Sequence, residues 1–497
     1  MKLILVFCFF ISTVSAELSL SKSLSDDMVF QRNQPITLWG RAKVNQTVKA
    51  TLENESIEVK SDSKGMWRLS LKPREASIEP HTINIISGKS IINLKNILIG
   101  DVWFCAGQSN MAYKVGSAFD FDQATSYKNN DQIRFLAMQR GPFTKPIVGE
   151  AAKALVPSQE NKDNFYKING WKSSSTKDIK SLSAVAYWFA QKVQQEQNIP
   201  IGLIVPPVGG SAVQAWVSRS AFETDPNLKP LLECWIQDEP ERLQKQLLPW
   251  LKSHPGAKFD DTPLHRHRPT TLFETAVQPM KDHAIKGVLW YQGEQNAQNE
   301  IQSKWHEKSF PHLIKGFREN WKQPDLPFYY VQLPGFGDTD WPSFREQQRR
   351  SLSISNTAMA VAIDLGDAKN IHPKDKRPIG ERLARLALKN SYSKDIVADS
   401  PYPESIKVEG NKVIVTYGGV GAGLKSAIKA IPHFELAGSD ENFQMADAKI
   451  ISKNQVSITV ASVKAPIHIR YAWKPFPRPL GLVNSADLPA VPFSEKL

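Results

Sequence analysis

The sequence of 497 residues has few cysteines, few long hydrophobic runs and no concentrated basic tract. Its three cysteines (Cys8, Cys105 and Cys234) are too few for a disulfide-rich scaffold. After the N-terminus, no stretch reaches the run of about 18 apolar residues that a membrane-spanning helix needs. The net charge is +12, but lysine and arginine are scattered among 50 acidic residues, which gives little support for nucleic-acid binding. These absences leave a globular protein in which Cys105 and Cys234 are interpreted as buried small residues, with a disulfide between them as the alternative.

Residues 1–16 have the pattern of a secretory signal peptide. Lys2 supplies a positive start, residues 3–14 are almost continuously apolar, and Val14-Ser15-Ala16 resembles a cleavage site. We therefore expect a secreted or periplasmic protein. An uncleaved N-terminal anchor and a lysosomal location are the alternatives.

Two regions have the alternating pattern of antiparallel β-structure. Between residues 17 and 98, short alternating segments such as 36–40 and 48–52 end at turn residues, which predicts an N-terminal β-sandwich. From residue 394 to 497 the same pattern returns, which predicts a C-terminal β-domain.

The region between them, residues 99–393, is typical of an α/β domain. Helical spacing over residues 182–197 and 304–321 separates short apolar runs that resemble buried strands. These runs are 102–105, 201–205, 287–291, 328–332 and 359–363. Strands that alternate with helices predict a parallel sheet covered on both faces.

In such a sheet, functional side chains gather at the carboxyl ends of the strands. Polar or glycine-rich clusters follow four of the predicted strands, at residues 106–111, 206–211, 292–297 and 364–373. Each cluster alone has an ordinary explanation as a turn, a helix cap or a polar loop. Their shared position is harder to explain by chance, and it predicts one site built from all four.

The residue types in these clusters fit nucleophilic catalysis. Ser109 follows the first strand, and the last cluster contains His372, a base that can take the serine proton. Backbone N–H groups of the paired glycines Gly209 and Gly210, together with the amide of Gln292, could stabilise an oxyanion. The carboxylate of Glu294 could orient the histidine.

The motifs that contain these residues resemble those of the sialate O-acetylesterase family, a branch of the SGNH-type hydrolases. The matching segments are Gly107-Gln108-Ser109-Asn110-Met111, Trp290-Tyr291-Gln292-Gly293-Glu294, Ile371-His372-Pro373-Lys374-Asp375-Lys376 and Trp341-Pro342-Ser343-Phe344-Arg345-Glu346, with further similarity near both ends of the mature chain. The resemblance implies a three-layer, flavodoxin-like α/β hydrolase domain flanked by N-terminal and C-terminal β-sandwich elements.

The resemblance also implies the catalytic roles. Ser109 is expected to be the nucleophile and His372 the base, with an oxyanion hole formed by the Ser109 N–H, Gly209 or Gly210, and Gln292. Many relatives place an aspartate three residues before the histidine, where this sequence has Lys369, and Asn370 also replaces a frequent aspartate. The acid is therefore expected to be Glu294, with Asp367 as the alternative.

The expected activity is removal of O-acetyl groups from sugars, most simply from sialic acids. The alternatives are an esterase for acetylated xylan or another polysaccharide, and a carbohydrate-binding protein without catalysis. Gln108 and Arg345 are predicted to contact the substrate. Arg345 could instead pair with a carboxylate.

No cofactor or metal is expected. Asp260, Asp261, His265 and His267 form a cluster that could suggest zinc, but the neighbouring arginines at 266 and 268 disfavour a cation. We interpret this cluster as a polar surface loop. The sequence predicts no stable membrane insertion and leaves the oligomeric state open.

Overall fold

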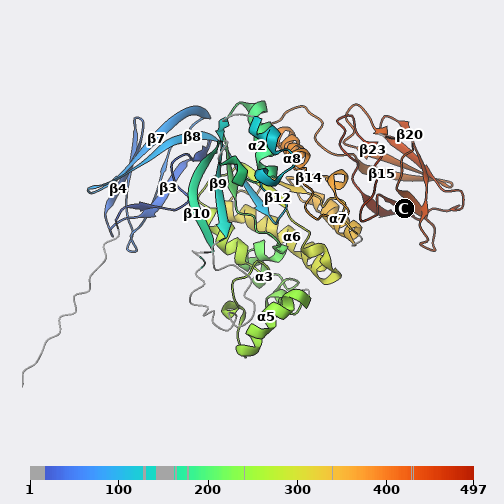
Figure 1. Cartoon of the computed structure of the whole chain (residues 1–497), viewed down its shortest axis with the longest axis horizontal. Helices are drawn as coiled ribbons and strands as arrows, with labels where there is room; N and C mark the ends of the chain where they lie inside the picture. Colours follow the sequence, from blue (N-terminus) through green and yellow to red (C-terminus); the bar gives the residue numbers. More distant parts are fainter. Residues whose placement is uncertain are drawn as a thin grey trace, which may run out of the picture.

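The computed structural model describes residues 17–126, 130–140, 162, 165–175, 178–239, 241–337, 340–426, 428 and 430–497. It is a mixed α/β structure with one large sheet and several smaller antiparallel sheets. The N-terminal strands lie on one side of the central α/β region and the C-terminal strands on the other (Figure 1). The α/β class predicted for the centre of the chain is confirmed.

The large sheet has the strand order β10-β9-β11-β8-β12-β13-β14 along its main path. All neighbours from β9 to β14 are parallel, and only the edge strand β10 is antiparallel. The strands are β8 (Ser90–Gly107), β9 (Asn130–Arg140), β10 (Tyr166–Ser174), β11 (Ile201–Val205), β12 (Gly287–Tyr291), β13 (Phe328–Val331) and β14 (Thr357–Ala360). The five predicted runs all contribute strands, although β14 ends at Ala360 and a 3₁₀ turn follows. Strands β9 and β10 were not expected.

Strand β8 joins the N-terminal region to the central sheet without a break. Its first half pairs with β7 (Ser77–Ser87) and β2 (Val29–Gln31), and its second half pairs with β11 and β12. The predicted domain boundary between residues 98 and 99 therefore falls inside a continuous strand. In the N-terminal region, β4 (Thr47–Leu52) and β5 (Glu55–Lys60) extend this sheet, and β1 (Ser19–Leu20), β3 (Ile36–Arg41) and β6 (Met66–Leu71) form a separate sheet.

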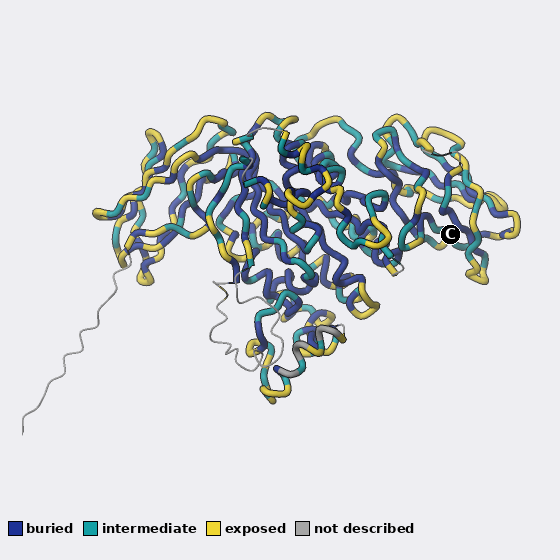
Figure 2. The backbone as a smooth tube through the Cα atoms, in the orientation of Figure 1, coloured by how far each residue is buried: buried dark blue, intermediate teal, exposed yellow. Residues whose placement is uncertain are grey.

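Alternate side chains of β8 belong to two different buried clusters. Trp103 and Cys105 pack with helices α2 (Ala184–Gln197) and α8 (Arg377–Asn390), whereas Phe104 packs with α6 (Glu300–Trp321). Helices α2 and α6 match the helical segments predicted over residues 182–197 and 304–321, which are confirmed. Figure 2 shows that burial is continuous through the central strands and that exposed segments concentrate at loops and hairpin ends. The remaining helices are α1 (Phe121–Ser126), α3 (Arg219–Thr224), α4 (Lys229–Cys234), α5 (Glu241–Ser253) and α7 (Trp341–Arg350).

The C-terminal region contains antiparallel sheets. One has the order β15-β16-β21-β20, a second has the order β19-β18-β22-β24, and β17 pairs with β23. Their bounds are β15 (Tyr402–Glu409), β16 (Lys412–Gly418), β17 (Lys425–Ser426), β18 (Phe434–Ala437), β19 (Gln444–Met445), β20 (Asp447–Ser452), β21 (Gln455–Thr459), β22 (His468–Tyr471), β23 (Leu482–Val483) and β24 (Phe493–Lys496).

Two predictions concern cysteines and the N-terminus. Cys105 is buried as expected, but Cys234 is partly exposed at the end of α4, and both are free thiols. The predicted signal peptide, residues 1–16, lies outside the described residues. Within the described ranges, none of the helices combines the length and the apolar character that crossing a bilayer requires.

Candidate active site

Ser109 and His372 meet at the carboxyl ends of the parallel strands. The His372 Nε2 atom lies 2.7 Å from the Ser109 Oγ atom, although 263 positions separate the two residues in the chain. Ser109 follows β8 directly, and His372 lies in the loop between β14 and α8. Both side chains are partly exposed. Burial, and then the positive charge of Lys376, lower the pKa of His372. The imidazole is therefore neutral at pH 7 and can accept a proton from the serine.

The turn before Ser109 depends on a close approach between two strands. Gly107 ends β8 opposite Tyr291, the last residue of β12, and its φ is +136°. A Cβ atom on Gly107 would lie 2.1 Å from the Tyr291 carbonyl oxygen, so only glycine fits there. The same carbonyl accepts the Gln108 N–H at 2.9 Å. These constraints direct the chain out of the sheet and bring Ser109 to its edge.

The glycine turn after β11 lies against this serine. The Val208 N–H donates to the Gly107 carbonyl at 3.0 Å, and a Cβ atom on Gly209 would lie 3.7 Å from the Ser109 Cβ atom. In the described part of the chain, the backbone N–H groups of Ser109 and Gly209 donate to no protein acceptor. Backbone N–H groups without a protein acceptor, on two segments that lie against each other, are what an oxyanion hole needs.

Gln292 does not have the geometry predicted for it. Its side chain is fully buried, and its Nε2 donates to the Ser211 carbonyl at 3.1 Å and to Asn296 Oδ1 at 2.8 Å. Asn296 Oδ1 also accepts the Val213 N–H, which fixes the position of the Asn296 side chain. The amide protons of Gln292 are therefore already used inside the protein. The prediction of an oxyanion contact is wrong, and Gln292 instead holds the glycine turn in place.

Neither candidate acid contacts the histidine. Among the described residues, no carboxylate forms a hydrogen bond or ion pair with the His372 side chain. The backbone N–H of His372 donates to Asn370 Oδ1 at 2.9 Å. Asp367 is exposed, and its carboxylate accepts the backbone N–H groups of Lys369 and Asn370. Glu294 is buried, and its carboxylate accepts from Asn110 Nδ2.

The contact between Glu294 and Asn110 belongs to a buried network beside the Ser109–His372 pair. Asn110 Nδ2 also donates to the Ile371 carbonyl at 3.0 Å, and Asn110 Oδ1 accepts from Lys376 Nζ at 2.5 Å. Asn110 follows Ser109 and Ile371 precedes His372, so one amide holds both segments. We call Glu294, Asn110 and Lys376 the amide bridge.

The charges of the amide bridge are strongly perturbed. Lys376 is fully buried, with its Nζ 4.9 Å from the centre of the Tyr113 ring, and burial lowers its pKa to about 7. Burial also raises the pKa of Glu294, while the Asn110 hydrogen bond and the Lys376 charge act in the opposite direction. The sequence patterns assigned no role to Asn110 or Lys376. Their positions, one residue after the serine and four after the histidine, are the signals that could have identified them.

The two predicted substrate contacts have different outcomes. Gln108 is 3% exposed, and its Oε1 accepts the N–H groups of Gly293 at 3.4 Å and Gln295 at 3.2 Å, which ties the β8 turn to the loop after β12. Its contact with substrate stays a prediction. Arg345 is 0% exposed.

The Arg345 guanidinium donates to the carbonyls of Pro334, Lys474 and Pro475, the latter two in the C-terminal region. A fully buried guanidinium with these acceptors cannot contact a sugar. The prediction of substrate binding by Arg345 is therefore wrong, because burial against the C-terminal region determines its position. Within the described ranges, the hydrogen-bond partners of Arg345 are carbonyls and include no carboxylate, so the alternative of a carboxylate partner is not supported either.

The histidine- and aspartate-rich cluster after residue 259 is not a simple surface loop. Asp260 pairs with Arg219 at 2.6 Å, whereas His267 is fully buried with its Nδ1 2.8 Å from Glu239 Oε2. The part of the chain that the structure describes contains no group of three histidine, cysteine or acidic side chains that could hold a metal ion.

Comparison with known proteins gives consistent matches over most of the chain. A sialate O-acetylesterase of Homo sapiens is 25% identical, with 95% of this chain and 91% of that protein covered. One of Pongo abelii is 26% identical with the same coverage. The solved structure of a carbohydrate acetylesterase from Xanthomonas citri has a TM-score of 0.80 and 27% identity, and the match covers 96% of this chain and 99% of that one.

The family match lies over the region that carries the site. The sequence model of the family described as "Carbohydrate esterase, sialic acid-specific acetylesterase" matches residues 99–225 and 257–389, more than half of the chain. These ranges contain Ser109, Gly209, Glu294 and His372. The chain therefore belongs to the carbohydrate esterase family of sialic acid-specific acetylesterases.

Proposed function

We propose that this protein is a serine O-acetylesterase that releases acetate from O-acetylated sialic acids. The observation that carries the proposal is the 2.7 Å contact between His372 Nε2 and Ser109 Oγ, in a chain of this family. The names of the curated relatives support the same substrate. A chain with this pair is poorly explained as a carbohydrate-binding protein without catalysis.

The proposed reaction has two halves. His372 Nε2 takes the proton from Ser109 Oγ, and Oγ attacks the acetyl carbonyl carbon. When the tetrahedral intermediate collapses, the bond between the carbonyl carbon and the sugar oxygen breaks, and His372 returns the proton to that oxygen. The acetyl group is now on Ser109. A water molecule then gives a proton to His372 and its oxygen attacks the same carbon, so that acetate leaves and Ser109 regains its proton.

The negative charge on the carbonyl oxygen would be stabilised by the N–H groups of Ser109 and Gly209. This assignment is supported by their proximity and by the absence of protein acceptors for them in the described residues. His372 would act without a carboxylate partner. The amide bridge is proposed to hold it in place instead, through Ile371.

Finer features of the fold and location belong to the same proposal. The parallel order β9-β11-β8-β12-β13-β14, with buried clusters formed by alternate β8 side chains, supports a three-layer SGNH-type domain. The flanking antiparallel sheets support β-sandwich elements. Secretion is supported by the sequence pattern of residues 1–16.

Replacement of the nucleophile tests the mechanism. Ser109→Ala and His372→Ala should each lower kcat for p-nitrophenyl acetate by at least about 10,000-fold, because neither residue works without the other. The double variant should be no worse than either single variant. Activity that survives in Ser109→Ala would remove this serine from the mechanism.

The substrate is tested separately. Acetate release from O-acetylated sialic acid and from acetylated xylan should be measured with the same enzyme. The proposal expects a higher kcat/KM for the sialic acid, and the reverse result would favour a polysaccharide esterase.

A further inference from the structure

Two arginines lie beside the glycine turn that faces the nucleophile. A Cβ atom on Gly209 would lie 3.7 Å from the Ser109 Cβ atom, and one on Gly210 would lie 3.4 Å from the Arg266 guanidinium carbon. The turn thus has the nucleophile on one side and a cation on the other. None of the steps proposed above uses Arg266.

Arg140 approaches the same turn from strand β9. In the parallel pairing of β9 with β11, Ala137 lies opposite Val205, so Arg140 extends beyond the end of β11. Its antiparallel partner Tyr166 donates to the Pro206 carbonyl at 2.9 Å, at the start of the turn. The Arg140 Nε–H is buried and has no acceptor in the residues that the structure describes. A buried donor without a partner at this edge points to a ligand acceptor.

The surroundings of the two arginines stay cationic. Burial lowers the pKa of Arg140, and the charge of Arg266 lowers it further. Burial keeps His265 neutral by lowering its pKa far below the usual value. Glu239, the carboxyl group that interacts with Arg266, lies 2.8 Å from His267 Nδ1, and burial raises its pKa. The two guanidinium groups themselves stay protonated at neutral pH.

We propose that Arg140 and Arg266 form a subsite for the carboxylate of an acidic sugar whose acetyl group reaches Ser109. This inference rests on the proposed function and names the feature of the substrate that the site recognises. Guanidinium groups bind carboxylates through paired, charge-assisted hydrogen bonds. Neighbouring strands lie about 4.8 Å apart, so β9 and β8, with β11 between them, are about 10 Å apart at this edge. One sugar acid with its substituents covers that span.

The subsite predicts discrimination by charge. A sugar carboxylate would form charge-assisted hydrogen bonds with the two guanidinium groups, whereas a neutral acetylated sugar offers no such group. The enzyme should therefore prefer an O-acetylated sialic acid over the corresponding carboxamide, which has the same shape but no charge.

The test is the ratio of kcat/KM for the free acid to that for the carboxamide. The wild-type ratio should be about 10 or more, and it should fall by about 10-fold in Arg266→Gln and in Arg140→Gln, since one charge-assisted contact is lost in each. Arg266→Lys, which keeps the charge but loses the planar fork, should give an intermediate ratio. The ratio is taken within each enzyme, so partial unfolding affects both of its terms equally.

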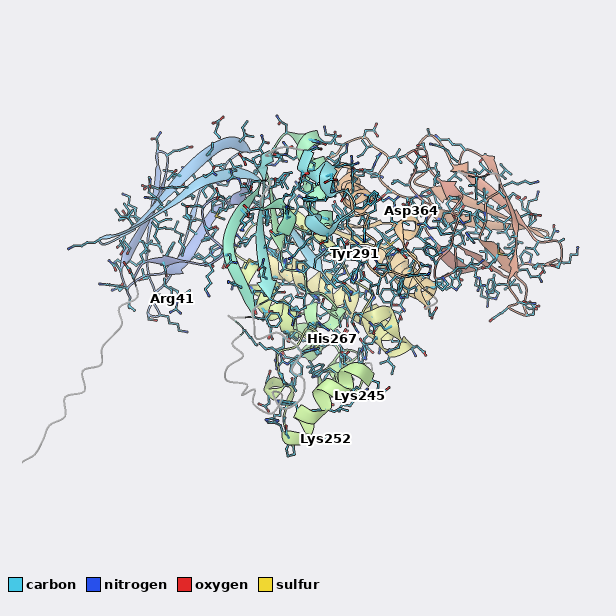
Figure 3. All side chains as sticks on the ribbon, viewed as in Figure 1. Arg41, Lys245, Lys252, His267, Tyr291 and Asp364 are labelled. Atoms are coloured by element: carbon cyan, nitrogen blue, oxygen red, sulfur yellow. The ribbon has the colours of Figure 1, made fainter. Side chains whose placement is uncertain are left out.

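The matched control is Arg41→Gln, which removes the same group from an exposed position in the N-terminal region. Tyr291 is the last residue of β12, and His267 is next to Arg266 in the sequence. In Figure 3, Arg41 lies far from both of these labelled residues. This variant should keep the wild-type ratio. A wild-type ratio near 1, or a ratio unchanged in both arginine variants, would overturn the subsite. If the wild type hydrolyses neither p-nitrophenyl acetate nor the acetylated sialic acid, the proposed function fails, and the subsite fails with it.

Discussion

At the scale of single residues, the two candidate acids have different environments. Glu294 is buried in the amide bridge, whereas Asp367 is exposed and holds only backbone N–H groups of its own loop. Glu294→Gln leaves the buried Lys376 without its opposite charge, so kcat/KM should fall by about 10- to 100-fold. Asp367→Asn should change it by less than about threefold, since the group is solvated.

Each of these variants is the control for the other, because both change a carboxylate to its amide. Kinetics with p-nitrophenyl acetate provide the measurement. If Asp367→Asn proved to be the damaging change, that aspartate would be the partner of His372 during turnover, and the loop would have to rearrange.

The pH profile should respond to Lys376. Both burial and the Lys376 charge lower the pKa of His372 from its ordinary value of 6.5. The acid limb of kcat/KM, which follows the protonation of this imidazole, should therefore lie below pH 6.5. Lys376→Met removes the cation, which raises the pKa of His372 and moves the acid limb of kcat/KM to higher pH. The position of the limb is the readout, whatever happens to the maximal rate.

Lys374→Met is the control for this experiment. Lys374 is exposed and does not contribute to the pKa of His372, so the limb should stay in place. An acid limb that is identical in all three enzymes would show that Lys376 does not act on the base.

The residues that the structure brings together as expected and those that it places differently are positioned by different kinds of contact. Ser109 and His372 follow strands of one parallel sheet, and strand ends meet at one edge whatever the details of packing. The direction of the Gln292 amide depends on the carbonyl of Ser211, 81 positions away, and the burial of Arg345 depends on residues near position 475. Such long-range contacts leave no local pattern in the sequence.

At the scale of elements, the β8 turn should tolerate no side chain at Gly107. Gly107→Ala combines a φ of +136° with a 2.1 Å approach to the Tyr291 carbonyl, so it should destabilise the protein by about 3 kcal/mol or more and abolish esterase activity. Thermal unfolding and p-nitrophenyl acetate kinetics measure the two effects.

Gly410→Ala separates the effect of the positive φ from the effect of the close approach to a neighbouring carbonyl. Gly410 has a φ of +65°, but nothing lies within 4 Å of an added Cβ atom. Only the backbone preference should then be lost, at a cost of about 1 to 2 kcal/mol. Equal losses in the two variants would mean that the approach to Tyr291 does not matter.

The sequence patterns did not predict strand β9 or the continuity of strand β8, and a physical reason can be given for each. Strand β9 contains Arg134, whose guanidinium is buried and donates to the Asp131 and Asn96 carbonyls, so a charge interrupts its apolar run. Strand β8 resembles two strands, because its residues alternate between exposed and at least partly buried up to Leu94 and are all buried from Ile97 onward. The pattern changes where the strand enters the central sheet.

At the scale of the whole molecule, Arg345 joins the central region to the C-terminal sheets. Arg345→Met would remove the buried guanidinium that donates to three carbonyls, two of them in the C-terminal region, which should cost about 3 kcal/mol of stability. The thermal unfolding midpoint should fall, and limited proteolysis should release the C-terminal region more readily.

The control is Arg350→Met on the same helix. Arg350 is 65% exposed, and its ion pair with Glu346 contributes no more than about 1 kcal/mol. A midpoint that falls equally in both variants would mean that the buried contacts of Arg345 have no special effect on stability.

Strand β8 limits how this enzyme can be engineered. The strand that carries the nucleophile begins in the N-terminal region, and Gln31 from that region accepts the Val102 N–H at 2.8 Å and donates to Asp101 at 2.7 Å. A fragment that starts near residue 99 would begin in the middle of this strand and lose these hydrogen bonds. The N-terminal region therefore cannot be removed or exchanged as an independent domain without cutting the strand that leads to Ser109.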